Sequence, residues 1–541
     1  MKLTFIGADH EVTGSCHFLE AAGKKILVEY GMEQGKDMFE NATVPVSAGE
    51  IDYVFVTHAH IDHTGLLPLL SAKGFHGRIY ATKATCDLCD IMLLDSAHIQ
   101  EFEAEWRNRK GRRKGAEPYV PLYTSEDVMN ILECFVPCEY DEVIEVTDGI
   151  RIRFTDVGHL LGSAAIEVWA QEAGEERKIV FSGDLGNYDQ PLIKDPKTVD
   201  SADYVLIEST YGDRSHGERN QDYVGQLAAI FQETFDRGGN VVIPSFAVGR
   251  TQEILYFIRE LKADGRVKGH DHFPVYVDSP LAVRATNIFN EHTADCFDEA
   301  AAALIARGVN PISFPNLRLA LSSDESREIN TIAEPKVIIS ASGMCEAGRI
   351  KHHLKHNLWR EESTILFVGY QAHGTLGRAL VEGAREVTLF GETVTVAAEI
   401  KVLPGISGHA DREGLLDWAE GFKEKPKRFF VVHGDDLVEK SFAALLKEKT
   451  GVEAVAPYPG TVWDLINDVC LKETEAIPIA RKDEDGKVVS KGGAKAASVY
   501  NRLENAAESL LSLVRSSKGL PNKELARFAD QIISLCDKWK R

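Results

Sequence analysis

The sequence predicts an α/β protein on the basis of three observations. Its first part alternates apolar and polar residues in short runs such as LTFIGA, HFLEAA, KILVEY and GRIYAT, a pattern typical of strands with one buried face. Three later apolar runs, NVVIPSFAVG, KVIISASGM and TILFVGYQAHG, end in small residues or glycine. Hydrophobic residues make up 44% of the 541 residues, which supports sizeable buried cores.

The three later runs predict a doubly wound parallel unit in the middle of the chain. Two of them lead into helical patterns, TQEILYFIRELKA and GRIKHHLKHNL. A repeated order of strand, glycine and helix is typical of a parallel sheet with helices on both faces. Its ligand-facing loops lie at the carboxyl ends of the strands.

The last part of the chain has a different character and predicts a short helical extension. From Arg481 to Arg541 it carries 13 Lys and Arg against 8 Asp and Glu. Apolar residues recur at helical spacing in two stretches, the first Tyr500, Leu503, Ala507, Leu510 and Val514 and the second Leu525, Phe528, Ile532 and Cys536. We expect a helical hairpin that serves in docking or homodimer formation, with nucleic-acid contact as the alternative.

The chain as a whole is acidic, with 83 Asp and Glu against 61 Lys and Arg and a net charge of −22. This charge argues against nonspecific coating of nucleic acid, although it leaves room for a nucleic-acid substrate in a local positive cleft. No apolar run approaches the roughly 20 residues that span a bilayer, and the first residues do not resemble a signal peptide. We expect a cytoplasmic protein that does not enter the membrane.

Nine cysteines, an odd number, fit a reducing compartment better than a disulfide framework. Cys86-x-x-Cys89 and Cys134-x₃-Cys138 have spacings that occur in metal sites. Both pairs lie in apolar, helix-like surroundings, which argues against a structural zinc site there.

A dense group of potential metal ligands follows the apolar run YVFVT. Within six residues it contains His58, His60, Asp62 and His63. Imidazole and carboxylate groups suit a borderline-soft dication such as zinc. In an extended or turning backbone the first two histidines can point to one side, while the aspartate and the last histidine turn toward a neighbouring point. This segment can therefore serve two adjacent ions.

Three more candidates each follow a hydrophobic run and precede glycine or a turn. They are His159 in DVGHLLGSA, Asp184 in IVFSGDLG and His433 in FFVVHGDD. Ligands at the rim of a sheet occupy such positions. Each residue alone could be a buried structural histidine or a capping aspartate, but together with HAHIDH they indicate a metal site.

The motif HAHIDHTG resembles that of the metallo-β-lactamase fold, and the order of the other candidates resembles its RNA-processing β-CASP branch. That branch includes RNases related to the endonuclease subunit that cleaves pre-mRNA before polyadenylation. The resemblance implies a metallo-β-lactamase αββα sandwich interrupted by an inserted β-CASP domain. We expect the first lactamase part at 1–210, the β-CASP domain at 211–387, the second lactamase part at 388–466 and the helical extension at 467–541.

The family pattern implies two Zn²⁺ ions held by histidine and aspartate side chains. It assigns His58, His60 and His159 to one ion and Asp62, His63 and His433 to the other, with Asp184 bridging both.

Two further residues look like the acidic and histidine motifs of the β-CASP branch. Glu208 ends the run in YVLIEST, and His409 lies in PGISGHAD. In the family this pair assists the leaving group, so we expect His409 to be the general acid, with Glu208 orienting its ring and favouring its protonated form. His433 looks like the third β-CASP motif, which is typically not histidine in DNA-processing members, and it therefore favours RNA.

Cleavage of a phosphodiester bond needs a nucleophile at neutral pH and stabilisation of the charge on phosphorus. Two ions roughly 3.5–4 Å apart can share a hydroxide and clamp the phosphate oxygens. We therefore expect a zinc-dependent ribonuclease, an endo- or exonuclease acting on single-stranded RNA, with Asp62, Glu208 and His409 as catalytic residues. The resemblance implies products with a 5′-phosphate and a 3′-hydroxyl.

Three turn-to-helix segments that resemble β-CASP segments offer phosphate contacts. In SASGMCEAGRIKHHL, N–H groups at the helix start could bind an anion near Ser342 and Gly343, with Arg349 about one turn inside. PSFAVGRTQ with Arg250 and GYQAHGTLGR with Arg378 are similar. Ordinary connections between sheet and helix are the alternative for all three segments.

Three local features stand apart from this pattern. The run RNRKGRRK at 107–114, between two predicted helices, is either a solvated loop or a phosphate track toward the cleft. Glu29 stands where the family usually has an aspartate that supports the metal ligands. His373 stands where relatives often carry an acidic residue.

Two alternatives to a ribonuclease remain open. One is a DNA nuclease or a small-ester hydrolase on the same fold, although Glu208, His409 and the large insertion argue against a small ester. The other is a non-catalytic scaffold in an RNA-processing complex. A scaffold is expected to have lost ligands, whereas all seven candidates are present here.

Overall fold

The computed structural model describes residues 1–34, 38–111, 118–216, 222–372, 374–403, 405, 407–479, 510, 514 and 522–539. The chain divides into two compact units, Met1–Ile477 and Pro478–Arg541. Among the described helices, none combines the length and the apolar character that a bilayer crossing requires.

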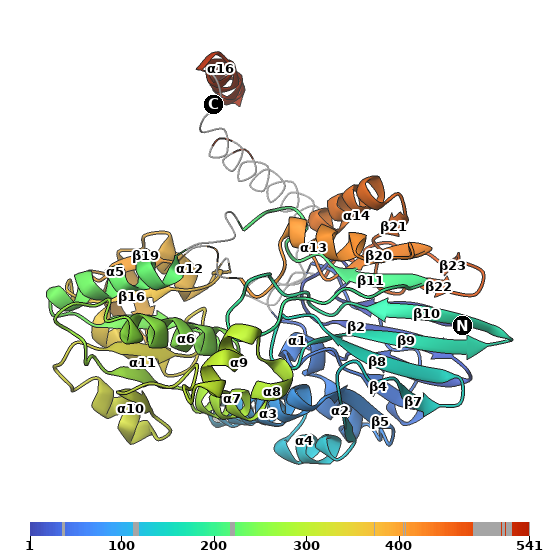
Figure 1. The fold of residues 1–541 in the computed structure, drawn as a ribbon, viewed down its shortest axis with the longest axis horizontal. Coiled ribbons are helices and arrows are strands. Elements are labelled where there is room, and N and C mark those ends of the chain that lie inside the picture. The colour runs from blue at the N-terminus through green and yellow to red at the C-terminus, as the bar shows by residue number, and fades with distance from the viewer. Residues whose placement is uncertain are drawn as a thin grey trace. The chain divides into compact units, whose positions relative to one another are not determined.

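Two β-sheets form a sandwich in the first unit (Figure 1). The first sheet has the order β23-β22-β1-β2-β3-β4-β5-β6, with strands at Val469–Lys472, Val462–Asp464, Lys2–Gly7, Cys16–Ala21, Lys24–Val28, Tyr53–Phe55, Arg78–Thr82 and Phe135–Cys138. The second has the order β21-β20-β11-β10-β9-β8-β7, with strands at Glu453–Val455, Arg428–Val432, Tyr204–Glu208, Glu175–Phe181, Ala164–Glu172, Ile150–Asp156 and Ile144–Thr147.

Alternate side chains of the strands separate the inner core from the outer cores. On β11, Tyr204 and Leu206 enter the core between the two sheets, whereas Val205 and Ile207 face the helices outside. This is the period of two that a strand imposes on its side chains. Strands such as YVLIE are apolar at almost every position because both of their faces are buried.

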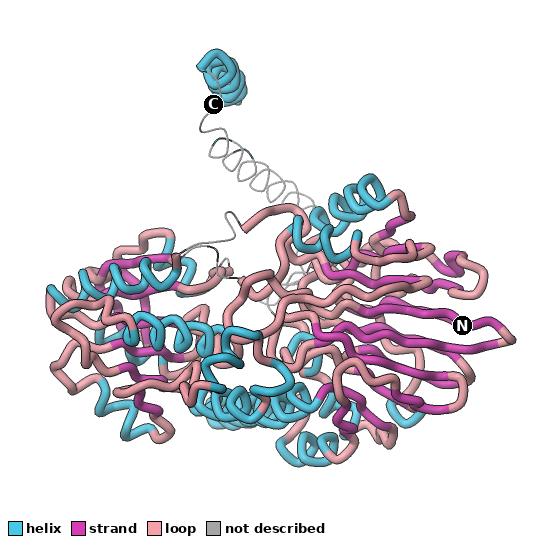
Figure 2. Tube along the Cα trace, in the orientation of Figure 1, coloured by secondary structure: helices cyan, strands magenta, loops and turns pink. Residues whose placement is uncertain are grey.

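Helices cover the outer faces of both sheets, as Figures 1 and 2 show. On the first sheet these include α1 (Ile61–Thr64), α2 (Leu67–Ala72), α3 (Lys83–Gly111) and α4 (Ser125–Leu132), with a short 3₁₀ turn at Ala48–Glu50. On the second they are α13 (Arg412–Glu420) and α14 (Asp436–Thr450). The predicted αββα sandwich is therefore confirmed.

A second domain is inserted between β11 and α13. Its six-stranded sheet has the order β14-β13-β15-β12-β16-β19, with strands at Leu317–Leu319, Val275–Val277, Val337–Ser340, Val241–Pro244, Thr364–Phe367 and Glu399–Val402. All its pairings are parallel, which confirms the predicted parallel unit.

Helices pack on both faces of this parallel sheet. They are α5 (Tyr223–Asp236), α6 (Arg250–Ala263), α7 (Pro280–Glu291), α8 (Thr293–Cys296), α9 (Glu299–Ala306), α10 (Ser323–Ile329), α11 (Ile350–Asn357) and α12 (Leu376–Val381). A small hairpin of β17 (Glu386–Leu389) and β18 (Glu392–Thr395) follows α12.

Strand pairing extends both domains beyond the expected ends at 387 and 466. β19 returns to the parallel sheet beside β16 after the hairpin, and β23 pairs with β22 at the edge of the sandwich. We therefore propose that the inserted domain ends near Val402 and the sandwich near Ile477.

The tail is described only in part. The second expected helix is confirmed as α16 (Asn522–Trp539), which contains Leu525, Phe528 and Ile532. The first stretch of the expected hairpin lies outside the described residues except for Leu510 and Val514, which are helical.

The direction of the strands determines where the functional loops lie. β8 and β10 are both antiparallel to β9, and β10, β11 and β20 are parallel to one another. These four strands therefore end at the same edge of the second sheet. Loops that follow them, and the loop after β4 of the first sheet, contain the candidate ligands.

Candidate metal centre

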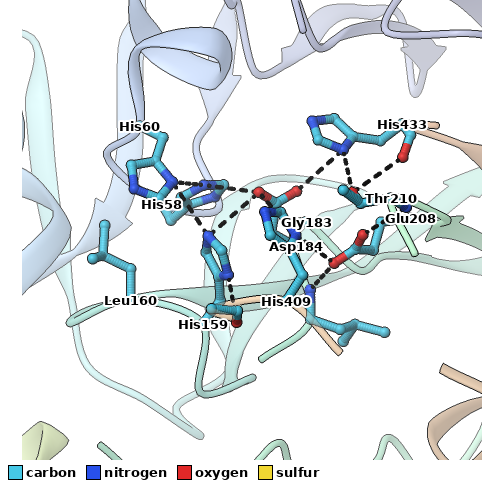
Figure 3. A network of polar contacts seen from close by, with 12 residues as sticks. His58, His60, His159, Leu160, Gly183, Asp184, Glu208, Thr210, His409 and His433 are labelled. Carbon is cyan, nitrogen blue, oxygen red and sulfur yellow. Dashed lines mark hydrogen bonds and ion pairs between the residues drawn. The ribbon is translucent and has the colours of Figure 1, made fainter. Parts of the chain in front are cut away.

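Three imidazoles meet at the edge of the sandwich (Figure 3). His58 follows β4, His60 immediately precedes α1, and His159 follows β8. Nδ1 of His60 lies 3.0 Å from Nε2 of His58 and 3.2 Å from Nε2 of His159. The structure therefore brings together the three histidines that the family pattern assigns to one ion.

A second group lies beside the first and consists of Asp62, His63 and His433. The first two are in α1, and His433 follows β20. Oδ2 of Asp62 is 3.8 Å from Nε2 of both histidines. This is the set that the family pattern assigns to the other ion.

Asp184 lies between the two groups, on the loop after β10 (Figure 3). Its Oδ2 is 3.4 Å from Nε2 of His58 and 3.4 Å from Nε2 of His159. Its Oδ1 is 3.4 Å from Nε2 of His63 and 3.7 Å from Nδ1 of His433. Each carboxylate oxygen therefore faces one group, which is the arrangement that a bridging ligand requires.

Hydrogen bonds behind the first group determine which ring nitrogens face inward. The Thr57 hydroxyl donates to Glu29, so its oxygen accepts from Nδ1 of His58, 3.0 Å away. Nδ1 of His159 donates to the carbonyl of Gly408 at 2.9 Å. In both rings the proton is on the outer nitrogen, and the lone pair of Nε2 points into the site.

The unusual Glu29 supports the second group. Its Oε1 lies 2.8 Å from Nδ1 of His63, and its carboxylate also accepts hydrogen bonds from the hydroxyls of Ser15 and Thr57. Burial would raise the pKa of Glu29, but the neighbouring His63 lowers it to about 2. The longer side chain is thus accommodated as an ionised carboxylate that orients a histidine.

The protonation states of the centre also suit a cation. Burial lowers the pKa of His60 to about 3 and lowers the pKa of His58 and His159 as well. Burial would raise the carboxyl pKa of Asp62 and Asp184, but the surrounding histidines lower both. Burial would also lower the pKa of His63 and His433, but the neighbouring carboxylates raise both, so the neutral imidazoles that metal ligands need are those of the first group.

The donor set fits divalent metal ions. Among the described residues, His63 Nε2, Asp184 Oδ1 and His433 Nε2 are buried and have no hydrogen-bond partner. Because an unpaired buried polar atom is costly, these atoms favour a bound ligand beyond the described side chains. Nitrogen and carboxylate oxygen donors in two adjacent groups match zinc better than calcium or magnesium.

Glu208 and His409 form a pair next to Asp184 (Figure 3). The buried Glu208 ends β11 and accepts hydrogen bonds from the backbone N–H groups of Leu185 and Thr210. Its Oε1 lies 3.1 Å from Nδ1 of His409, which therefore donates to it. Burial would lower the pKa of His409, but Glu208 and Asp184 raise it to about 9.

A cavity of about 670 Å³ lies beside this pair. It is lined by Asn187, Gln190, His216, Ser407 and Asp411 of the sandwich and, from the inserted domain, by Tyr223, Glu253, Tyr256, Phe257 and Asp298 among others. Its volume is in the range of ligand sites, and its aromatic and polar lining suits a nucleoside better than a small ester.

Each of the three arginines expected to anchor phosphate pairs with a carboxylate in the structure. Arg250 pairs with Glu253, Arg378 with Glu382, and Arg349 with Asp278. All three guanidinium groups thus have carboxylate partners within the inserted domain.

The helix expected directly after Ser342 and Gly343 begins later than predicted. α11 begins only at Ile350, because residues 341–349 fold back on themselves. Ile350 N donates to the carbonyl of Ala341, and Ser342 N donates to that of Ala347. The loop closes on itself before the helix starts, so Ser342 is not at the helix N-terminus.

The remaining sequence features have these outcomes. Arg107, Arg109 and Lys110 lie near the C-terminal end of α3 rather than in a loop, while residues 112–117 and His373 lie outside the described residues. Arg107 and Arg109 pair with Glu103 and Glu105. Within the described part of the chain, no cluster of potential ligands contains a cysteine.

Sequence reasoning missed the residues that hold the ligands from behind. Ser15, Thr57 and Thr210 contact Glu29, His58 and His433, respectively. The position of Thr57 directly before His58 was the one local clue. The other two contacts join segments that are far apart in the chain, which spacing alone does not reveal.

Family models match three parts of the chain. They are the metallo-β-lactamase superfamily at residues 11–230, the β-CASP domain at 251–380 and a Zn-dependent metallo-hydrolase RNA specificity domain at 393–457. With the fold and the ligand geometry, these matches define a metal-dependent hydrolase.

Curated relatives place the chain more narrowly. It is 36% identical to Ribonuclease TTHA0252 of Thermus thermophilus over 439 residues, which cover 81% of this chain and 94% of that protein. It is 31% and 30% identical to the transcription termination factors FttA of Methanosarcina mazei and Methanocaldococcus jannaschii, covering 84% of this chain and 70% of each factor. The chain belongs to the β-CASP family of metallo-hydrolases.

We predict that Gly31→Ala weakens zinc binding by about tenfold or more, in the range seen when groups that support ligands are disturbed. A Cβ at Gly31 would lie 1.6 Å from the carbonyl oxygen of Asp62, which also accepts a hydrogen bond from Ser15 N. The added methyl group must displace the α1 segment that carries Asp62 and His63. Competition with a chromophoric chelator measures the change.

Gly369→Ala is the matched control, because an added Cβ meets no atom within 4 Å there and the backbone needs no positive φ. Zinc affinity of Gly31→Ala equal to that of the wild type would show that this close approach does not position the ligands.

Proposed function

We propose that this protein is a zinc-dependent ribonuclease that hydrolyses phosphodiester bonds of single-stranded RNA. The observation that carries the proposal is the position of Asp184 between two ligand groups, with the Glu208–His409 pair beside it. The names of the T. thermophilus relative and of the matched RNA specificity domain support RNA as the substrate.

Two zinc ions complete this proposal. His58, His60 and His159 would hold one, Asp62, His63 and His433 the other, and Asp184 both. When bound, the ions would supply Lewis acidity that activates a water molecule and neutralises charge on the phosphate. Asp62, whose side chain is 22% exposed, is proposed both as a ligand and as a catalytic carboxylate facing the substrate.

His409 is proposed as the general acid. Because its Nδ1 donates to Glu208, the proton for the leaving 3′-oxygen resides on Nε2. Burial would lower the pKa of His409, but Glu208 raises it and so favours the protonated imidazole before the reaction. Glu208 is fixed by two backbone N–H groups and holds the ring in this orientation. Protonation of the leaving 3′-oxygen would give products with a 5′-phosphate and a 3′-hydroxyl.

Substrate contacts outside the centre remain part of the proposal. The loop of Ser342 and Gly343 follows β15 at the carboxyl edge of the parallel sheet, where ligands of such folds bind. A phosphate could bind the guanidinium groups of three arginines only beside their present carboxylate partners or in place of them. These arginines are Arg250, Arg349 and Arg378.

The alternatives are less well supported. A non-catalytic scaffold has no need of seven converging ligands with fixed ring orientations. A small-ester hydrolase has no need of a cavity of about 670 Å³ or of a second carboxylate–histidine pair. A DNA nuclease has the same chemical requirements, and it is therefore distinguished by experiment.

We predict that the zinc-loaded protein cleaves end-labelled single-stranded RNA and acts at least about tenfold more slowly on DNA of the same sequence. Removal of the metal with a chelator should abolish cleavage, and added zinc should restore it, because the nucleophile depends on the ions. A denaturing gel measures the rates and separates internal cuts from stepwise trimming. Full cleavage by protein that elemental analysis shows to be metal-free, or cleavage of DNA alone, would contradict the proposal.

We predict that His409→Ala lowers the rate of RNA cleavage by about 100-fold or more, the usual contribution of a general acid. Two zinc ions per chain should remain, because His409 is not among the proposed ligands. Hydrolysis of bis(4-nitrophenyl) phosphate should fall far less, because its phenolate leaves without a proton. Equal losses on both substrates would remove His409 from the role of acid.

A further inference from the structure

Two connections between the domains run side by side next to His409. Residues 214–216 lead from the sandwich toward the inserted domain. Residues 409–412 lie at the point where the chain enters the sandwich again, just before α13. Arg412 N donates to the carbonyl of Arg214 at 3.0 Å. His216 N and the hydroxyl of Ser215 each donate to Oδ2 of Asp411, also at 3.0 Å. We call this group of contacts the crossover clamp.

Asp411 anchors the clamp to a helix. Its Oδ1 accepts a hydrogen bond from Gly414 N at 3.0 Å and so caps the start of α13. Asp411 is buried, and its hydrogen bonds lower its carboxyl pKa although burial would raise it. The clamp therefore rests on an ionised carboxylate held by the first turn of α13.

The side chain of His216 makes the contact that reaches the general acid. Its Nε2 lies 3.0 Å from the backbone carbonyl oxygen of His409 and donates to it. The ring of Tyr211 packs edge-on against His216, with centroids 4.8 Å apart, and also against His409 at 6.0 Å. Burial lowers the pKa of His216, so the ring is neutral and carries its proton on Nε2.

The backbone around His409 is also held by the loop that carries Asp184. Ala410 N donates to the carbonyl of Leu185 at 2.7 Å, and Gly186 and His409 form an isolated antiparallel bridge. The general acid is therefore held between the loop of the bridging aspartate and His216. The contact with the Asp184 loop sets the distance of His409 to the metal centre, and the hydrogen bond from His216 sets the orientation of the His409 peptide.

We propose that His216 is a positioning residue for the leaving-group histidine, which acts by fixing the peptide of His409 through the Nε2 hydrogen bond. This inference rests on the proposed function, because it assigns His216 a role in proton transfer by His409. His216 also lies at the border of the cavity of about 670 Å³.

The test uses His216→Ala and His216→Gln in the full chain. Glutamine can place its amide N–H close to the position of Nε2, whereas alanine removes the donor. We expect His216→Ala to lower kcat for RNA about 10- to 100-fold with KM and zinc content unchanged, and His216→Gln to retain kcat within about threefold of the wild type. His270→Ala, which removes a histidine bonded to Asp236 on the inserted domain, is the matched control and should leave kcat unchanged.

A double mutant separates positioning from a general structural role. If His216 acts through His409, His216→Ala should cause no further loss in a His409→Ala background. Hydrolysis of bis(4-nitrophenyl) phosphate should be nearly unaffected by His216→Ala, since that leaving group needs no proton. An equal loss with both substrates, or additive losses in the double mutant, would overturn the inference.

The outcomes also distinguish this inference from the proposed function. If the wild type cleaves RNA, His409→Ala is inactive and His216→Ala is as active as the wild type, the role of His216 is wrong and the proposed function stands. If the wild type does not cleave RNA, the proposed function fails. Should His216→Ala not fold, His216→Gln decides alone, since kcat more than tenfold below that of the wild type in a folded, zinc-loaded variant would contradict positioning by the Nε2 donor.

Discussion

The carboxylate of Asp184 is the feature on which the rest of the centre depends. It is buried, it carries a negative charge, and four imidazoles surround its two oxygens at 3.4–3.7 Å. A buried ion left unpaired costs several kcal/mol, so the fold must provide positive charge on both sides of it. The surrounding histidines do so in part, and the two cations that we propose would do so in full. The same burial that makes this arrangement costly without metal favours a bound cation.

The sandwich meets this constraint through strand direction and through hydrogen bonds behind the ligands. Strands β8, β10, β11 and β20 end at one edge, which brings together residues that are up to several hundred positions apart in the chain. Thr57, Glu29 and the carbonyl of Gly408 then fix the rings, so that lone pairs rather than protons face inward. One of the two connections to the inserted domain carries His216, which contacts His409 on the other.

Much of this could be predicted from the sequence, for identifiable reasons. The candidate ligands His58, His159, Asp184 and His433 follow the ends of apolar strands by one to three residues, and such strand ends can be predicted from the sequence pattern. The parallel sheet was visible because three of its strands end in small residues before helices or turns. By contrast, β19 pairs with that sheet only after the β17–β18 hairpin, and no local sequence pattern predicts a strand pairing across an intervening hairpin.

The contacts that support the candidate ligands could not be predicted from the sequence, for a different reason. Thr210, Ser15 and His216 are ordinary polar residues whose roles arise only when distant segments meet. The helix start expected next to Ser342 failed because the loop 341–349 forms its own hydrogen bonds before α11 begins. The ion pair of Arg349 could not be predicted either, because its partner Asp278 follows another strand of the same sheet. In each case tertiary contact, not local spacing, decides the outcome.

The central claim is that the two ligand groups hold two ions on either side of Asp184. Anomalous diffraction from crystals of the zinc-loaded protein, collected above and below the zinc absorption edge, tests it most directly. The account predicts two anomalous peaks, one within about 2.0–2.1 Å of nitrogens of His58, His60 and His159 and one beside His63 and His433, with Asp184 bound to both. A single peak, or peaks remote from Asp184, would contradict it.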